Sequence, residues 1–157
     1  MRRMWRGASL LATGFVLGAV VMFGYQMTTK VRPLLRMSLE FERQALEARF
    51  EMAYRQADYS TVECTHEPLN LIASAILKDA SDDEKRLVLS SLGLSYGRLA
   101  KAAEKAGRLE DRDKFLGAAR FTLHETDPGF TTNEQVQALV SRQDSSSPFG
   151  SCAGGQK

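Results

Sequence analysis

The densest group of reactive side chains in this sequence is the run ECTHE at residues 63–67. A thiolate, an imidazole and carboxylates can bind zinc, and a cysteine near a histidine can form a nucleophile pair. Structural zinc needs four converging ligands, however, and the only other histidine of the chain is His124. A nucleophile pair also needs a third group that orients the base, and none is evident here. We therefore predict no catalytic residue, no metal site and no cofactor.

An enzyme that uses Cys64 and His66 remains as the outside alternative, and an unchanged phenotype after both are replaced by alanine would remove it. The second cysteine, Cys152, stands at no metal-binding or redox-active spacing from Cys64. The two thiols are either free or, in an oxidising compartment, joined. We interpret residues 60–67 as a polar loop that leads into a helix opened by Pro68, since proline is favoured in a first turn.

The charges of the chain are unevenly distributed. Hydrophobic residues make up 43% and charged residues 25% of the 157 residues, which is typical of one folded domain. Six basic residues and no acid precede Met37, so the rest of a chain with a net charge of +2 carries −4. A slightly acidic domain is a poor surface for phosphate backbones. We therefore expect no nucleic-acid partner.

The uncharged run 7–27, GASLLATGFVLGAVVMFGYQM, predicts a transmembrane helix. A helix of this length rises about 30 Å, which matches the hydrocarbon core of a bilayer. Backbone polar groups in lipid must pair within the segment, and a helix achieves this. Residues 1–6 form a basic flank before the run, further basic residues follow it, and an aromatic ring lies near each end, at Trp5 and Tyr25.

A cleaved signal peptide is the main competing interpretation, but no pair of small residues precedes a cut near residues 23–27. An acid-free start also suits a mitochondrial targeting segment, although such a segment would carry arginine within its helix. A short basic N-terminus usually stays inside. We therefore expect a single-pass protein of the bacterial inner membrane with its domain outside, in the periplasm, and the mitochondrial inner membrane as the alternative.

Within the predicted span, Gly14 and Gly18 stand one helical turn apart. Small residues at this interval let two helix backbones approach closely. We predict that this face binds other membrane protein subunits or a second copy of the chain. The alternative is that these glycines only reflect the general frequency of glycine in spanning helices.

Residues 28–59 predict one long amphipathic helix with Pro33 near its start. Its charged residues recur one turn apart and support the helix locally as a solvated face. Its apolar residues form two sets at helical spacing, which together predict a broad apolar face. The first set is Leu35, Leu39, Leu46, Phe50 and Ala53, and the second is Met37, Phe41, Ala45, Ala48 and Met52.

Residues 60–143 are predicted to form a helical domain. Their apolar side chains recur every three or four residues, and no window shows the strict alternation of an exposed strand. The predicted fold class is therefore all-α: one N-terminal transmembrane helix, a long juxtamembrane helix and a small helical bundle. Ser81 and Glu84 predict a capping box at the start of one helix, and Gly107 predicts the turn that follows it.

The C-terminal part of the chain is predicted to change from helix to tail. Residues 144–157 have too little apolar surface to compensate for the entropy of ordering, which predicts a disordered tail. The last helix is predicted to begin at Thr131 or Thr132, with Glu134 or Gln135 as its capping partner, and to bury Val136, Leu139 and Val140.

The run LSSLGLSY at residues 89–96 resembles the first helix of a tetratricopeptide repeat. That family has Leu-Gly followed by Tyr at these intervals, because the glycine lets the neighbouring helix approach and the tyrosine packs across it. The resemblance covers one repeat, residues 85–128, and a free-standing array is excluded because solenoids need about three. It implies a helical hairpin that binds protein segments through Leu92, Gly93, Tyr96 and Arg112, although Arg112 stands where the family has a small alanine. A generic hairpin of two helices is the alternative.

Together these observations predict a membrane-anchored helical subunit that acts as a structural or assembly component of a larger membrane protein complex. The alternative is a membrane-tethered adaptor that resembles tetratricopeptide-repeat proteins and binds peptide segments of its partners. A domain of this size buries only a modest fraction of its surface on folding and is marginally stable alone. This favours a protein partner that covers its helices.

Overall fold

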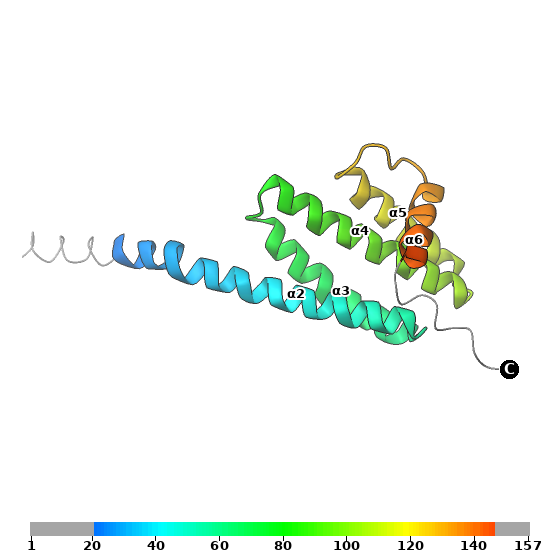
Figure 1. Ribbon diagram of the computed structural model, residues 1–157, viewed down its shortest axis with the longest axis horizontal. Coiled ribbons are helices and arrows are strands. Elements are labelled where there is room, and N and C mark those ends of the chain that lie inside the picture. Colours follow the sequence, from blue (N-terminus) through cyan, green and yellow to red (C-terminus); the bar gives the residue numbers. More distant parts are fainter. Residues whose placement is uncertain (1–20, 147–157) are drawn as a thin grey trace, which may run out of the picture. The chain divides into compact units, whose positions relative to one another are not determined.

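The computed structural model describes residues 21–146, which form two compact units that divide between Phe41 and Glu42. Each unit is described by itself. The part of the chain that the structure describes is helical and contains no strand, and this confirms the predicted all-α class (Figure 1). Its elements are η1 at Met27–Val31, α2 at Arg32–Arg55, α3 at Tyr59–Leu77, α4 at Asp82–Lys105, α5 at Leu109–His124 and α6 at Asn133–Ser146.

The first unit is one helical path that widens briefly. Residues 21–26 are α-helical, and the π-helical turn η1 follows, with the Arg32 N–H donating to the Met27 carbonyl five residues back. The Thr29 hydroxyl donates to the Tyr25 carbonyl over 2.6 Å. Pro33 is the second residue of α2, but it lies inside this continuous helical path rather than near the start of a helix, where it was predicted. Because proline has no N–H to donate and crowds the preceding turn, the wider turn directly before it lets the helix continue.

None of the helices within residues 21–146 is both long enough and apolar enough to cross a membrane. Most of the predicted span, residues 7–20, lies outside the described residues, and so do Gly14 and Gly18. Of the predicted tail at residues 144–157, the part from residue 147 onward, which includes Cys152, also lies outside them.

The long helix predicted over residues 28–59 ends earlier than expected, at Arg55. Ala57 adopts a left-handed backbone with a φ of 58°, the Asp58 N–H donates to the Ala53 carbonyl, and the Ala57 N–H donates to the Tyr54 carbonyl. This pair of bonds is a Schellman motif, which usually has glycine where Ala57 stands. The Asp58 side chain then accepts a hydrogen bond from the Thr61 N–H and caps the next helix.

The prediction of a loop over residues 60–67 and a helix opened by Pro68 is wrong, because α3 begins at Tyr59 and runs through Pro68 to Leu77. Proline within a helix removes one backbone hydrogen bond. The buried face of α3 continues on both sides of the proline at spacings of three and four, so its packing outweighs that loss. The buried residues are Val62, Thr65, His66, Leu69, Ala73 and Ile76.

The hairpin of α4 and α5 follows the predicted local patterns. The capping box at the start of α4 is confirmed: the Ser81 hydroxyl accepts from the Glu84 N–H over 3.4 Å, and the Ser81 N–H donates to the Glu84 carboxylate over 2.8 Å. Gly107 forms the predicted turn with a φ of 74°. Since glycine adopts this conformation without strain, the chain reverses tightly there.

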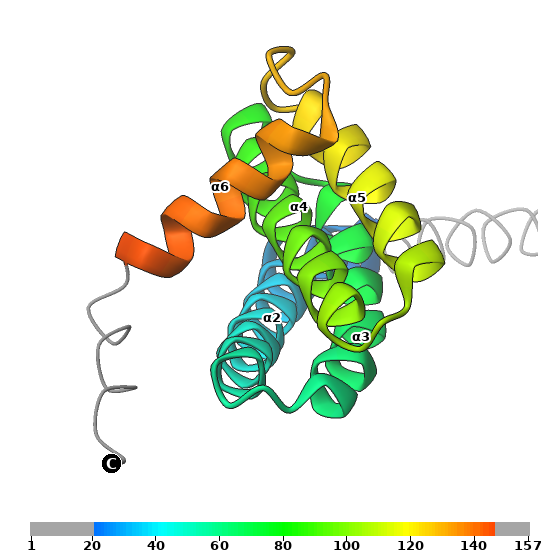
Figure 2. The ribbon, with the colours of Figure 1, turned by 90° about the vertical axis from the view of Figure 1, so that its right-hand side faces the viewer.

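The second unit is organised around α4, against which α3, α5 and α6 all pack. Figure 2 shows α6 crossing α4 on the side where it also meets α5. One core cluster lies between α4, α5 and α6, and a second joins the C-terminal part of α2 to α3 and α4. Of the two apolar sets on α2, Phe50 and Ala53 of the first are buried, whereas Met52 of the second is exposed.

Helix α6 begins as predicted and ends later. Thr132 and Gln135 form its cap: the Thr132 N–H donates to the Gln135 side-chain oxygen over 2.9 Å, and the Gln135 N–H donates to the Thr132 hydroxyl. The helix extends to Ser146, so residues 144–146, which were predicted to be part of the disordered tail, are helical. Asp144 explains the difference, because its carboxylate is bonded to side chains of α2 and α4.

Candidate functional site

The structure separates the two reactive side chains of the predicted cluster at residues 63–67. Cys64 and His66 lie two residues apart on α3, which places them about 200° apart around the helix. Cys64 is exposed, whereas the side chain of His66 is buried. The two do not face a common site. Within residues 21–146 no three histidine, cysteine or acidic side chains are grouped as metal ligands would be.

His66 belongs to the core between α2, α3 and α4. Its ring lies 4.3 Å from the ring of Tyr96 and 6.3 Å from that of Phe50, measured between centroids. Only 7% of the residue is exposed, and its Nε2 atom has no hydrogen-bond partner. Burial lowers the pKa of His66 to about 4, because no partner offsets the loss of hydration of the charged ring. His66 is therefore neutral at physiological pH.

The residues predicted from the repeat resemblance do not form one surface. Gly93 lies against α5 so closely that a Cβ atom there would stand 2.6 Å from the Leu123 Cγ atom. This is the close helix approach that the pattern predicts. Leu92 and Gly93 are buried, and Tyr96 packs against both core clusters. These three residues position α4, and Arg112 alone lies at the rim of a cavity.

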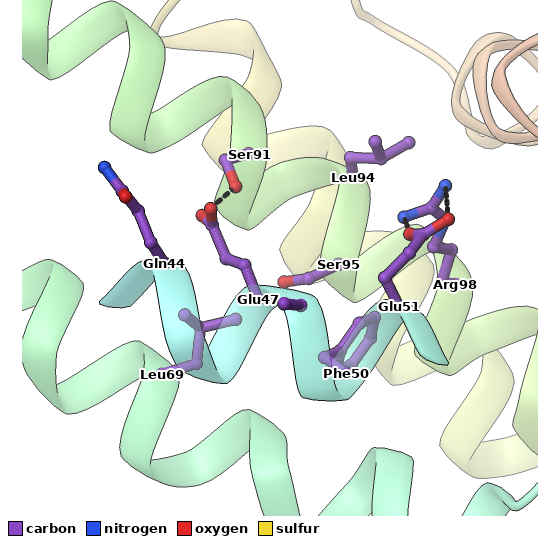
Figure 3. A pocket seen from close by; sticks show the side chains of 10 residues that line it. Gln44, Glu47, Phe50, Glu51, Leu69, Ser91, Leu94, Ser95 and Arg98 are labelled. Atoms are coloured by element: carbon purple, nitrogen blue, oxygen red, sulfur yellow. Dashed lines mark hydrogen bonds and ion pairs between the residues drawn. The ribbon is translucent and has the colours of Figure 1, made fainter. Parts of the chain in front are cut away.

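A cleft of about 430 Å³ lies between the C-terminal part of α2 and α4 (Figure 3). Its floor includes the apolar side chains of Phe50 and Leu69. Two polar bridges span it from α2 to α4: the Ser91 hydroxyl donates to Glu47, and Arg98 donates to Glu51. Both carboxylates therefore have partners on α4, and these two bridges join α2 to α4 across the cleft.

Arg98 is the centre of a polar network that joins α2, α4 and α6. Besides its pair with Glu51, its guanidinium lies 3.5 Å from the Asp144 carboxylate and 5.3 Å above the ring of Tyr54. Asp144 also accepts hydrogen bonds from the Tyr54 hydroxyl over 2.9 Å and from the Lys101 ammonium over 2.7 Å. The end of α6 therefore pairs with side chains of the other two helices by charge and hydrogen bonds.

The electrostatics of the network favour an ionised carboxylate. Burial alone would raise the pKa of Asp144, but the hydrogen bonds from Lys101 and Tyr54 and the nearby positive charges outweigh it and lower that pKa. Burial, together with the bond to Asp144, raises the pKa of the Tyr54 hydroxyl. Tyr54 therefore remains a proton donor and Asp144 an acceptor throughout the physiological range.

Helix α6 lies in an apolar groove on α4 and α5, which we call the α6 groove. It consists of Gly97, Ala100, Leu116 and Ala119. Val136 and Val140 of α6 are 0% and 2% exposed. A Cβ atom at Gly97 would stand 2.6 Å from the Val140 Cγ2 atom, so the missing side chain makes the seat for α6.

Cavities lie on both sides of α6. One of about 230 Å³ is lined by Lys101, Glu104 and Arg112 at its rim and by Val140 of α6. The other, of about 380 Å³, is lined by Phe130, Leu139 and Arg142. Helix α6 therefore packs tightly along one line of side chains and loosely on its flanks.

No family model, curated protein or solved structure matches this chain. The resemblance of residues 85–128 to a tetratricopeptide repeat thus remains a prediction.

Sequence reasoning identified the apolar residues of α6 but not Arg98 or Asp144 as members of a site. The pattern that would have found Asp144 is its spacing, because it follows Val136 and Val140 at intervals of four on the same face. Arg98 carries no such pattern, since its partners Glu51 and Asp144 are 47 and 46 residues away in the sequence.

Proposed function

We propose that this protein is a membrane-anchored helical subunit that acts as a structural or assembly component of a larger membrane protein complex. The observation that carries the proposal is the helical segment at residues 21–27, where the large apolar side chains are exposed. Val21, Met22, Phe23 and Tyr25 are between 64% and 69% exposed. Full burial of a valine, methionine or phenylalanine side chain is worth about 1.5–3 kcal/mol, so a lipid or protein environment is favoured for these exposed residues.

The segment also continues the uncharged run that begins at residue 7. Under the proposal residues 7–27 span the membrane, and Gly14 and Gly18 form the face that meets another spanning helix. The second unit lies outside, in the periplasm of a bacterial inner membrane, or on the corresponding side of a mitochondrial inner membrane. Its role is binding rather than catalysis.

Membrane extraction tests the anchor. The full chain with a C-terminal tag should remain in the membrane fraction after an alkaline carbonate wash, and a variant that begins at Thr28 should be released. A control with residues 7–27 in scrambled order keeps the composition and should remain in the membrane. If expression of the full-length gene gave a protein in the aqueous phase that had been cleaved after Tyr25, the anchor would be overturned.

Crosslinking in detergent-solubilised membranes tests the assembly role. The chain should be recovered with other chains, and the combined change of Gly14 and Gly18 to leucine should reduce that recovery at least severalfold, because leucine keeps the backbones apart. Gly24→Leu is the matched control, since a side chain at Gly24 meets nothing within 4 Å. Recovery of free monomer alone would count against the proposal.

A membrane-tethered adaptor that binds peptide segments is the second candidate. The α6 groove favours it, because this groove already holds one amphipathic helix by apolar side chains and a terminal acid.

A further inference from the structure

Helix α6 is attached to the rest of the bundle by a small number of buried side chains. Val136 and Val140 are its buried residues, and they lie one turn apart. A cavity of about 230 Å³ lies between α6 and the α4–α5 hairpin, and one of about 380 Å³ lies between α6 and residues 127–130, so neighbouring side chains leave both flanks of α6 open. Residues 125–132 join it to α5 without a helix of their own. Few apolar contacts and open flanks are the features of a segment that opens locally at low cost.

One end of the α6 groove is polar and positively charged, so it favours an acidic side chain. At the position where α6 presents Asp144, Lys101 donates to the carboxylate over 2.7 Å, Arg98 lies 3.5 Å away, and the Tyr54 hydroxyl donates over 2.9 Å. Arg112 lines the same side of the groove. An occupant that carries a carboxylate two turns beyond its first apolar contact therefore matches the groove by charge as well as by shape.

We propose that the α6 groove is a binding site for an amphipathic helix of a partner protein, and that α6 is its displaceable resident. The partner helix carries a β-branched residue at two positions four apart and an acidic residue four further on, as Val136, Val140 and Asp144 do. Gly97 explains the need for β-branched residues in the partner helix, because the missing side chain leaves a space that Val136 and Val140 already fill closely. The inference rests on the proposed binding role of the bundle.

Because α6 is tethered to the bundle by its linker, it competes strongly with any free helix for the groove. A short linker holds a segment at an effective concentration in the millimolar range. A free helix at micromolar concentration therefore reaches the groove only when α6 is weakened or when the partner binds far more tightly. The intact chain should bind a helix in trans weakly, and a chain whose α6 cannot dock should bind it strongly.

The probe is a fluorescein-labelled peptide of residues 131–146, added to the full chain in detergent and followed by fluorescence anisotropy. Val136→Asp together with Val140→Asp removes the apolar contacts of α6 and leaves the groove intact. This variant should bind the peptide at least about tenfold more tightly than the unchanged chain. A peptide with the same two changes should not bind. Equal, negligible binding by both chains would overturn the proposal.

Two matched variants locate the binding. Gly97→Val, added to the α6-weakened variant, fills the groove and should abolish capture of the peptide. Gly117→Val is the control, because a side chain at Gly117 meets nothing within 4 Å, and it should leave capture unchanged. A peptide with Asp144→Lys should bind severalfold more weakly, with the difference shrinking at high salt. Equal loss of capture by both glycine variants would overturn the assignment to the groove.

Hydrogen exchange on the unchanged chain provides a measurement that does not depend on any variant. The amides of α6 should exchange at least about tenfold faster than those of α4, since α6 opens without the rest of the bundle. Equal protection would mean that α6 leaves only on global unfolding and would overturn the proposal. Dimers that exchange α6 between two copies would also overturn it, because the occupant would then be the chain itself. Failure of the membrane anchor changes extraction and not peptide capture, so the two failures are distinguishable.

Discussion

His66 provides a measurement of how completely the core between α2, α3 and α4 excludes water. In the folded protein burial lowers the pKa of His66 to about 4, below its ordinary value of 6.5. The unfolded chain therefore binds a proton at His66 between these two pKa values, and the folded chain does not. The contribution of His66 to the free energy of unfolding is fully present above pH 6.5 and is lost as the pH falls toward 4.

The magnitude follows from the same two pKa values. Proton linkage gives a loss of about 2 kcal/mol in the free energy of unfolding between pH 7 and pH 5, and about 3 kcal/mol once the pH lies below both pKa values. Because the ring packs against Tyr96 and Phe50, His66→Phe should remove most of this loss between pH 7 and pH 5. The assay is denaturant unfolding of the full chain in detergent, followed by circular dichroism at each pH.

Nuclear magnetic resonance of the imidazole protons measures the pKa directly, since the chain contains two histidines. His124→Gln identifies the resonance of His66 and serves as the control for unfolding, where it should preserve the pH dependence. A pKa of His66 near 6.5 in the folded protein would refute the reasoning, and so would an unchanged pH slope in His66→Phe. Either result would mean that water or a polar partner reaches the Nε2 atom.

The remaining predictions concern local structure and are measured by the same unfolding assay. Gly93→Ala should cost about 1–3 kcal/mol because its Cβ atom would stand 2.6 Å from the Leu123 side chain, whereas Gly117→Ala meets nothing within 4 Å and should stabilise by about 0.5–1 kcal/mol; equal effects would refute the close approach. Ala57→Gly should stabilise by about 1 kcal/mol, because its φ of 58° is left-handed; a loss of stability would contradict that conformation. Ser81→Ala should cost about 1 kcal/mol through loss of the capping box, and no change would contradict the cap.

Several helix boundaries were decided by the sequence alone. Ser81 with Glu84 starts α4, and Thr132 with Gln135 starts α6, because each pair satisfies backbone N–H groups that have no partner within the helix. Gly107 forms the turn between α4 and α5, because glycine adopts a left-handed backbone without strain. These features depend on residues within four positions of each other, so they can be read without knowledge of the fold.

The start of α3 and the interior position of Pro68 were decided by packing. The polar residues before the proline resemble a loop, and proline usually marks a boundary, so local preference favours a break there. In the structure α3 presents one continuous buried face to α4 on both sides of Pro68, and burial of that face outweighs one lost hydrogen bond. The spacing of the residues across 62–76 indicates this continuous face. The face stabilises an unbroken helix, however, only because α4 packs against it.

The candidate site depends on the tertiary structure almost entirely. The network of Glu51, Arg98 and Asp144 joins residues more than 40 positions apart, and no spacing rule relates them. The α6 groove likewise exists because α4 and α5 pack closely at Gly93, and because the missing side chain at Gly97 leaves room for two valines of α6. The sequence determines which residues can form helices, through local backbone and side-chain energetics. The packing of those helices determines which side chains meet, because burial and ion pairing act across distances that the chain order does not encode.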